Sequence, residues 1–138
     1  MRGRAERGMS KRNTKRILKR VAQYEERWYD EREVERNYFL ELFRRAEFQW
    51  DEDKDRINYR KHGLHFVSVI TVFKDPYALI LEDTSHSWEK RYDMIGKANV
   101  VVFVVFTVRN ETFIRLISAR RATKNEEERY GFRKNDMG

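Results

Sequence analysis

The stretch from Arg115 to Tyr130, RLISARRATKNEEERY, decides the fold because it joins a strand pattern directly to a helix pattern. Residues 112–119 are rich in apolar side chains and predict a strand. Thr123 is a helix-capping residue type, and it predicts a final helix that runs to about Arg129. The chain is therefore expected to end in a strand followed at once by a helix.

Upstream of this junction, the sequence predicts an antiparallel meander. The predicted strands span residues 77–81, 91–95, 100–108 and 112–119, with turns at Gly96 and at residues 109–111. Connections this short force neighbouring strands to pair antiparallel. The expected sheet is therefore antiparallel in this part of the chain.

Helix patterns precede the meander. Asp51 predicts the cap of a polar helix that runs to His62, where Gly63 supplies a left-handed stop. Residues 66–73 have apolar side chains at helical spacing, and Asp75-Pro76 ends that segment. Residues 48–50 alternate and predict a short first strand. The predicted class is α+β, an antiparallel sheet packed with helices.

Two regions of the chain differ in charge. Residues 1–46 hold 14 basic and 8 acidic residues, whereas the rest is nearly balanced, and the whole chain has a net charge of +7. Residues 1–46 are predicted to be a basic helical extension with a disordered start of about 12 residues, and residues 47–138 the compact domain. The basic excess favours a polyanionic partner.

Composition also bounds the class of protein. Cysteine is absent, which excludes disulfides and thiolate zinc sites. The longest apolar run, Val100–Phe106, is far shorter than the ~20 residues that cross a bilayer. We therefore expect a soluble cytoplasmic protein with no membrane partner.

Three arginines surround the end of the last predicted strand. They are Arg115, Arg120 and Arg121, and no acidic residue lies between Arg115 and Glu126 in the sequence. A guanidinium group suits phosphate recognition, and a helix start adds backbone N–H donors. The alternative is ordinary surface charge. We expect these side chains to gather with those near residue 91 in one phosphate-sized pocket.

Residues that could act as general acid or general base are predicted near these arginines. Glu126 and Tyr130 share one face of the last helix, although Glu127 and Glu128 are adjacent alternatives. Glu89 and Arg91 share a strand face, and His86 lies in the loop before them. Solvated surface positions are the alternative for each of them.

Lys61 and His62 close the polar helix, where their charge already complements the helix dipole. The histidines are too few for a metal site, so no metal and no cofactor are expected. Side chains of these types can cleave RNA without a metal, with the ribose 2′-hydroxyl as nucleophile. General acid–base help of this kind contributes typically ~10²–10⁴-fold.

The same residues carry a family resemblance. The segments in order are residues 48–51 (FQWD), 61–63 (KHG), 72–76 (VFKDP), the 86–91 segment and 117–123 (ISARRAT), followed by Glu126 and Tyr130. Together they resemble BrnT, the toxin family of a bacterial type II toxin–antitoxin system. The resemblance covers residues 47–131, roughly two thirds of the chain.

The resemblance implies a RelE-like fold, a metal-independent endoribonuclease and growth arrest. It also implies a BrnA-like ribbon-helix-helix antitoxin, through which operator DNA is bound indirectly. The implied site comprises, in or near it, Lys61, His62, Glu89, Arg91, Arg115, Arg120, Arg121, Glu126 and Tyr130. Arg120 and Arg121 would stabilise phosphate charge, Glu89 or Glu126 would act as base or orienter, and Tyr130 or His62 as acid.

Residues 1–46 depart from the short toxin of this family. They leave five interpretations open: a fused regulatory helix, an RNA-attracting arm, a subunit-contact helix, a start assigned too early, or a poorly ordered or loosely packed appendage. Two other functions compete with the nuclease, namely a non-catalytic nucleic-acid-binding module and a partner-binding protein. Cleavage of RNA and arrest of growth would distinguish the nuclease from both of these alternatives.

Overall fold

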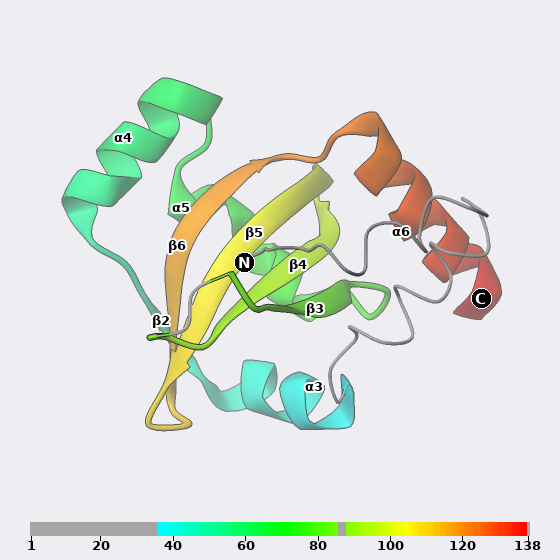
Figure 1. Ribbon diagram of the computed structural model, residues 1–138, viewed down its shortest axis with the longest axis horizontal. Coiled ribbons are helices and arrows are strands. Elements are labelled where there is room, and N and C mark those ends of the chain that lie inside the picture. Colours follow the sequence, from blue (N-terminus) through cyan, green and yellow to red (C-terminus); the bar gives the residue numbers. More distant parts are fainter. Residues whose placement is uncertain (1–35, 86–87, 138) are drawn as a thin grey trace. The chain divides into compact units, whose positions relative to one another are not determined.

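The computed structural model describes residues 36–85 and 88–137, which form a sheet with helices packed on it (Figure 1). The strands are β2 (Glu47–Gln49), β3 (Leu79–Asp83), β4 (Arg91–Ala98), β5 (Val100–Arg109) and β6 (Phe113–Arg121). The helices are α3 (Arg36–Arg45), α4 (Glu52–His62), α5 (Phe66–Val69), the 3-10 helix η1 (Ile70–Lys74) and α6 (Lys124–Met137). The α+β class is confirmed. None of these helices is both long and apolar enough to cross a membrane.

The five strands lie in the order β2-β6-β5-β4-β3. The four longer strands form the predicted antiparallel meander. The short strand β2 instead pairs in parallel with β6, so the sheet is mixed rather than wholly antiparallel. Only strands that are joined by a short turn must be antiparallel, and most of the domain separates β2 from β6.

One predicted turn is wrong. Gly96 lies inside β4, and the turn before β5 is made at Asn99, whose φ is 75°. Gly96 is required for close packing instead, because a Cβ atom built there would lie 2.8 Å from a methyl group of Val72. The predicted turn at residues 109–111 is confirmed, with positive φ at Asn110 and Glu111.

The start of α4 and its end follow the predicted capping. The Asp51 carboxylate accepts hydrogen bonds from the backbone N–H groups of Asp53 (2.7 Å) and Lys54 (3.3 Å). Gly63 adopts the left-handed conformation (φ 73°) and donates to the Tyr59 carbonyl at 2.8 Å. Local sequence alone therefore fixes the length of this helix.

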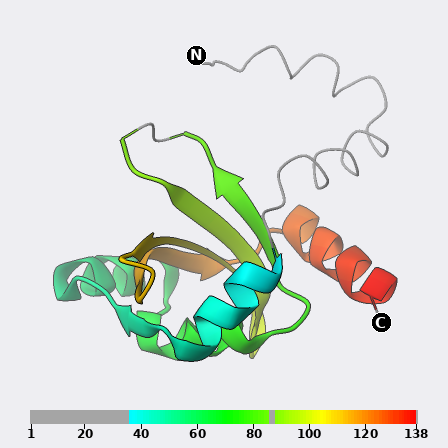
Figure 2. The same cartoon turned by 90° about the horizontal axis from the view of Figure 1, so that it is seen from below.

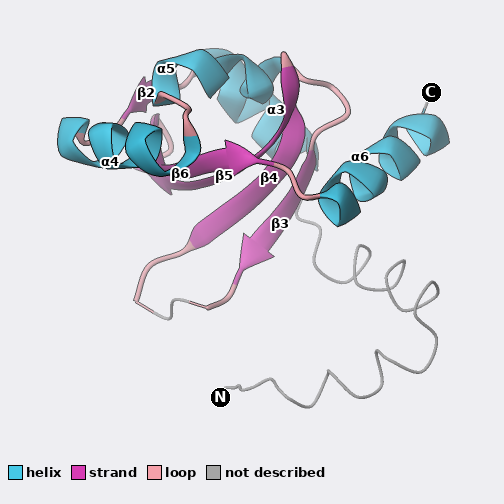
Figure 3. Cartoon of the chain, turned by 90° about the horizontal axis from the view of Figure 1, so that it is seen from above, coloured by secondary structure: helices cyan, strands magenta, loops and turns pink. Residues whose placement is uncertain are grey.

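The core lies between the sheet and the helices α3, α5 and η1, which share one face of it (Figures 2 and 3). Four aromatic rings meet there. The ring centre of Phe43 lies 5.0 Å from that of Phe73, 5.8 Å from that of Phe106 and 5.6 Å from that of Phe39. On α3 the buried side chains are Phe39, Leu42 and Phe43, whereas Tyr38 is exposed. The segment 66–73 forms one short α-helix and one 3-10 helix rather than a single α-helix.

The helix α3 falls inside the predicted extension 1–46, yet it packs into the same core as the sheet. The compact unit Val34–Gly138 contains α3 together with the sheet. The remainder of the predicted extension lies outside the described residues. Its predicted helix and its proposed roles stay predictions.

Candidate active site at the end of the sheet

A β-bulge in β6 decides which arginines share a face of the sheet. The pairing of β5 with β6 shifts after Val105, which leaves Ile117 as the extra residue of the bulge. The alternation of side chains therefore restarts there. Arg115 and Arg120 occupy positions on the face away from the core helices, and Arg121 occupies a position on the opposite side, at the end of β6.

Arg120 is held firmly at the junction between β6 and α6. Its two terminal nitrogens donate to the two carboxylate oxygens of Glu126 at 2.8 and 3.0 Å. Its guanidinium also lies 4.2 Å from the centre of the Phe103 ring. Glu126 in turn accepts from the Thr123 backbone N–H (2.9 Å), while its own N–H donates to the Thr123 hydroxyl (3.2 Å). These two bonds form a capping box that fixes the first turn of α6.

The electrostatics of the Arg120–Glu126 pair follow from this geometry. Burial by itself raises the pKa of Glu126, but hydrogen bonds from Arg120 and Thr123 outweigh it and lower the pKa below its ordinary value. The hydrogen bond to Glu126 raises the pKa of Arg120. Glu126 is therefore an ionised carboxylate that orients Arg120, whereas Glu127 and Glu128 are exposed.

Tyr130 is committed to a structural contact. Its hydroxyl donates to the Asp75 carboxylate at 2.7 Å, and the side chain is buried. Asp75 also accepts from the backbone N–H groups of Lys97 (2.7 Å) and Tyr77 (2.9 Å). Burial and then the bond to Asp75 raise the pKa of Tyr130. A buried phenol with a raised pKa that already donates its proton to a carboxylate is poorly placed to act as an acid on RNA.

A second group of charged side chains lies on the same sheet face as Arg120, near the start of β4. Arg91 donates to Glu89 at 2.8 Å, and Arg109 lies 3.8 Å from the same carboxylate. Arg115 lies on β6 opposite Thr107 of β5, and its guanidinium donates to the Gln49 side chain on β2 at 3.5 Å. Glu89 is thus shared between two guanidinium groups.

The sheet register separates these two groups. Arg120 pairs with Phe103, and Phe103 pairs with Ile95 on β4. Arg91 lies four residues before Ile95, which is about 13 Å along the strand. Arg91, Arg120 and Arg121 therefore do not gather in the single phosphate-sized pocket that the sequence favoured. Arg91 and Arg120 lie on one face of the sheet, whereas Arg121 lies on the opposite side, at the end of β6.

The helix α4 covers the free edge of β6 beyond β2. The buried Asn58 side chain accepts from the Ala119 N–H (3.0 Å) and donates to the Ala119 carbonyl (2.8 Å), as a neighbouring strand would. The same amide nitrogen donates to the Leu64 carbonyl at 2.9 Å. Figure 1 shows α4 running in the same direction as β6, so the last turn of α4 lies toward the end of the sheet where β6 ends. That turn holds Lys61 and His62.

This end of the sheet also carries Arg121. Its guanidinium makes no hydrogen bond or ion pair with another described residue, and the side chain is exposed. Lys61 and His62 are likewise exposed and make no such bond with the described part of the chain. These three groups are therefore available to a ligand. His86 lies outside the described residues, and its predicted role stays a prediction.

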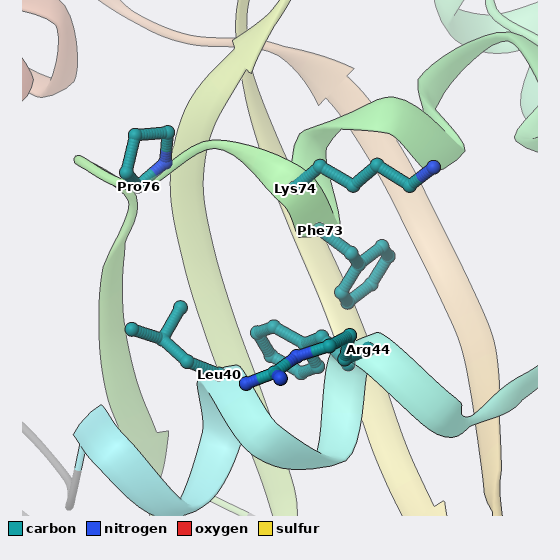
Figure 4. A pocket seen from close by; sticks show the side chains of 6 residues that line it. Leu40, Arg44, Phe73, Lys74 and Pro76 are labelled. Atoms are coloured by element: carbon teal, nitrogen blue, oxygen red, sulfur yellow. The ribbon is translucent and has the colours of Figure 1, made fainter.

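A groove on the helix-covered side is separate from this end of the sheet. It has a volume of about 390 Å³ and is lined by Leu40, Phe43, Arg44, Phe73, Lys74 and Pro76 (Figure 4). Its lining holds two cations and two aromatic rings but no carboxylate or imidazole. The groove therefore offers no group for acid–base chemistry.

Several residues that shape the site were missed from the sequence. Phe103 and Asp75 were interpreted only as strand and helix-end residues, and Asn58 only as part of a polar helix. A single Asn in a helix gives no signal that it will pair with a strand edge. Among residues 36–85 and 88–137, no three His, Asp or Glu side chains cluster as a metal-binding group, and metal independence stays a prediction.

Comparison with known proteins adds the identity of the domain. Residues 50–126 match the model of the family described as the ribonuclease toxin BrnT of a type II toxin–antitoxin system. The crystal structure of the ribonuclease toxin BrnT from Brucella abortus is similar, with 26% sequence identity and a TM-score of 0.47. That alignment covers 57% of this chain and 99% of the other. No curated protein matches the chain significantly.

The family match spans more than half of the chain and includes α4, the meander and the residues from Arg115 to Glu126. Tyr130 and most of α6 lie beyond it. The ribonuclease assignment therefore rests on this match and not on the predicted single pocket. The chain belongs to the BrnT family of ribonuclease toxins of type II toxin–antitoxin systems.

Proposed function

We propose that this protein cleaves RNA without a metal ion, by attack of a ribose 2′-hydroxyl on the adjacent phosphorus. The family match over residues 50–126 is the observation that carries the nuclease assignment. The side chains at the end of β6 and in the last turn of α4 support the mechanism, because they offer cations and an imidazole. Expected products are a 2′,3′-cyclic phosphate, which can open to a 3′-phosphate, and a free 5′-hydroxyl.

We assign the phosphate to Arg121, with Lys61 of α4 as a second cation. Arg121 is the exposed guanidinium of the junction, whereas the Arg120 charge is compensated by Glu126. A cation aimed at the charge that develops on the phosphorane can lower the barrier by a few kcal/mol. Arg120 then acts as a positioning residue that fixes the end of β6 through Glu126.

We assign protonation of the leaving 5′-oxygen to His62. An imidazole has its ordinary pKa near neutral pH, which suits proton transfer to a leaving group. The 2′-oxygen bonds to phosphorus, its proton passes to water, and the bond from phosphorus to the 5′-oxygen breaks. Tyr130 takes no part in this proposal because its hydroxyl is buried against Asp75.

Arg91, Arg115 and Glu89 are assigned to the sheet face that continues from the junction. We propose that RNA beyond the cleaved bond lies along this face, with Arg115 as one phosphate contact. His86 remains a candidate contact with the RNA. Phosphate contacts of this kind make binding weaken as salt rises.

The test uses purified protein and end-labelled single-stranded RNA in EDTA. Cleavage should persist in the chelator, and a 2′-deoxy substitution at the cleaved position should block it. Arg121→Ala should reduce the rate by about 10²–10³-fold and His62→Asn by about 10²-fold. Arg44→Ala removes an exposed arginine of α3 and serves as the matched control. Intact RNA, or cleavage that stops in EDTA and returns with added Mg²⁺, contradicts the proposal.

The toxin assignment also implies a protein partner. We propose a BrnA-like antitoxin with a ribbon-helix-helix part that contacts operator DNA while its remainder neutralises the toxin. Induced expression of this chain should arrest growth, and co-expression of the neighbouring gene should relieve it. Growth arrest without cleavage of cellular RNA would instead favour a non-catalytic binding module.

A further inference from the structure

Two aromatic rings lie stacked at the surface where α4 passes into α5. The rings of Tyr59 and His65 are 4.2 Å apart and within 6° of parallel. Tyr59 is 50% exposed, and the side chain of His65 is 46% exposed. Neither ring contributes to the buried core, so their outer faces are open to a ligand.

The His65 ring is fixed by a second contact. Its Nδ1 lies 2.9 Å from the Asp55 carboxylate, whose side chain is only 14% exposed. The other oxygen of Asp55 accepts from the Phe66 backbone N–H at 2.7 Å and so caps the start of α5. Because one carboxylate holds both the ring and the helix start, the stack is preorganised and loses little freedom when a ligand binds.

The stack lies close to the proposed cleavage site. The Asn58 amide nitrogen donates to the Leu64 and Ala119 carbonyls at 2.9 and 2.8 Å. The residues that follow these two carbonyls are His65 and Arg120. The chain segments that carry the stack and the strand–helix junction are therefore joined by a single side chain.

The charge around the stack favours a polyanion. The last turn of α4 carries Arg60, Lys61 and His62, all exposed. The acidic residues Glu52, Asp53 and Asp55 lie in the first turn, and of these Asp55 is bonded to the His65 ring. Exposed aromatic rings next to cations are the two parts of a single-strand binding surface, in which each base stacks on a ring. A double-stranded ligand offers no such free base face.

We propose that Tyr59 and His65 form a stacking platform for one unpaired nucleobase of RNA, next to the strand–helix junction. The proposal rests on RNA as the substrate and adds a subsite that selects single-stranded RNA. It requires a base, not only a phosphate, at this position. It also requires an aromatic ring at residue 59 and not merely an apolar side chain.

The test measures binding separately from cleavage. A fluorescent single-stranded 2′-O-methyl oligonucleotide has no free 2′-hydroxyl for the proposed attack, and its affinity for the full chain is read by anisotropy. Tyr59→Ala and Tyr59→Leu should weaken binding about 5- to 100-fold, the range for one stacked base. Tyr59→Phe should stay within about twofold of wild type. Ile57→Ala removes an equally exposed side chain of the same helix and is the matched control.

A second arm uses an abasic oligonucleotide of equal length and charge. Wild type should prefer the oligonucleotide with bases, and Tyr59→Ala should lose most of this preference. The platform is overturned if Tyr59→Ala binds like wild type, or if Tyr59→Phe weakens binding as much as Tyr59→Ala. It is equally overturned if all variants lose affinity for both oligonucleotides alike. Cleavage of ordinary RNA by wild type, assayed in parallel, reports on the nuclease mechanism independently of these outcomes.

Discussion

Two neighbouring regions at the end of the sheet contain the same kinds of side chain but use them differently. In the first, Arg120 and Tyr130 are bonded to Glu126 and Asp75, and these bonds attach α6 to the sheet. In the second, the side chains of Lys61, His62 and Arg121 are exposed and make no hydrogen bond or ion pair with other described residues. The first region holds the fold together, and the second is free to meet a substrate.

The difference between adjacent arginines is the clearest case. Arg120 and Arg121 are neighbours in a strand and so lie on opposite sides of β6, and the bulge at Ile117 puts Arg120 rather than Arg121 on the face that carries Arg115. A guanidinium that is already bonded to a carboxylate offers a phosphate less net charge than an unbonded one. The pair of arginines is therefore best understood as one structural residue followed by one binding residue.

The largest expected effect comes from breaking the contact that holds α4 beside β6. Asn58→Ala removes three hydrogen bonds and leaves the buried N–H and carbonyl of Ala119 without their partner. Each unpaired buried group costs about 1–3 kcal/mol, so the free energy of unfolding should fall by about 3–5 kcal/mol. Urea unfolding measures it, and the exposed Asn125→Ala is the control. A loss below about 1 kcal/mol would mean that α4 is held by other contacts.

Substitution of the two arginines separately tests the comparison itself. Arg120→Ala leaves Glu126 without its partner in a largely buried position, and the free energy of unfolding should fall by about 2 kcal/mol. Arg121→Ala should change stability by less than about 0.5 kcal/mol. The order for RNA cleavage per folded molecule should be the reverse, with Arg121→Ala the slower enzyme. Equal stability losses for the two variants would argue against this division.

Local sequence was enough to predict the elements of the fold. The Asp51 cap, the Gly63 stop and the turn at residues 109–111 depend on neighbouring residues only, and all three are confirmed. The parallel strand β2 and the position of Gly96 inside β4 were not predicted, because both depend on contacts far along the chain. Gly96 signalled a turn but serves close packing against Val72.

The candidate site was harder to predict for the same reason. Alternation along β6 places Arg115 and Arg121 on one face, and only the bulge at Ile117 exchanges Arg121 for Arg120. A bulge depends on the partner strand and leaves no mark on the sequence of β6. Likewise, nothing near Tyr130 indicates that its hydroxyl will reach Asp75, which is 55 residues away in sequence.

Tyr130→Phe tests whether this residue is structural. The variant removes the hydrogen bond to Asp75, and the free energy of unfolding should fall by about 1–2 kcal/mol while cleavage per folded molecule is unchanged. Because folding raises the pKa of Tyr130, its contribution is fully present below the ordinary tyrosine value near pH 10 and is lost as the pH rises above it. Melting temperatures at pH 7 and pH 11 measure this. A large loss of cleavage with normal stability would restore Tyr130 as an acid.

The smallest expected effect concerns Glu126, whose pKa is lowered in the folded protein. A lowered pKa stabilises the fold at pH values above the ordinary one for a glutamate, near 4.3, and this contribution disappears as the pH falls through the folded value. Glu126→Gln should therefore reduce the free energy of unfolding by about 1 kcal/mol at pH 7 and by much less near pH 3. Glu127→Gln, one residue along the same helix turn and exposed, should match wild type at both pH values. Because both variants remove one negative charge from the first turn of α6, the bonds of the Glu126 carboxylate with Arg120 and Thr123 are what distinguish them. A difference that persists at pH 3 would have to come from packing instead.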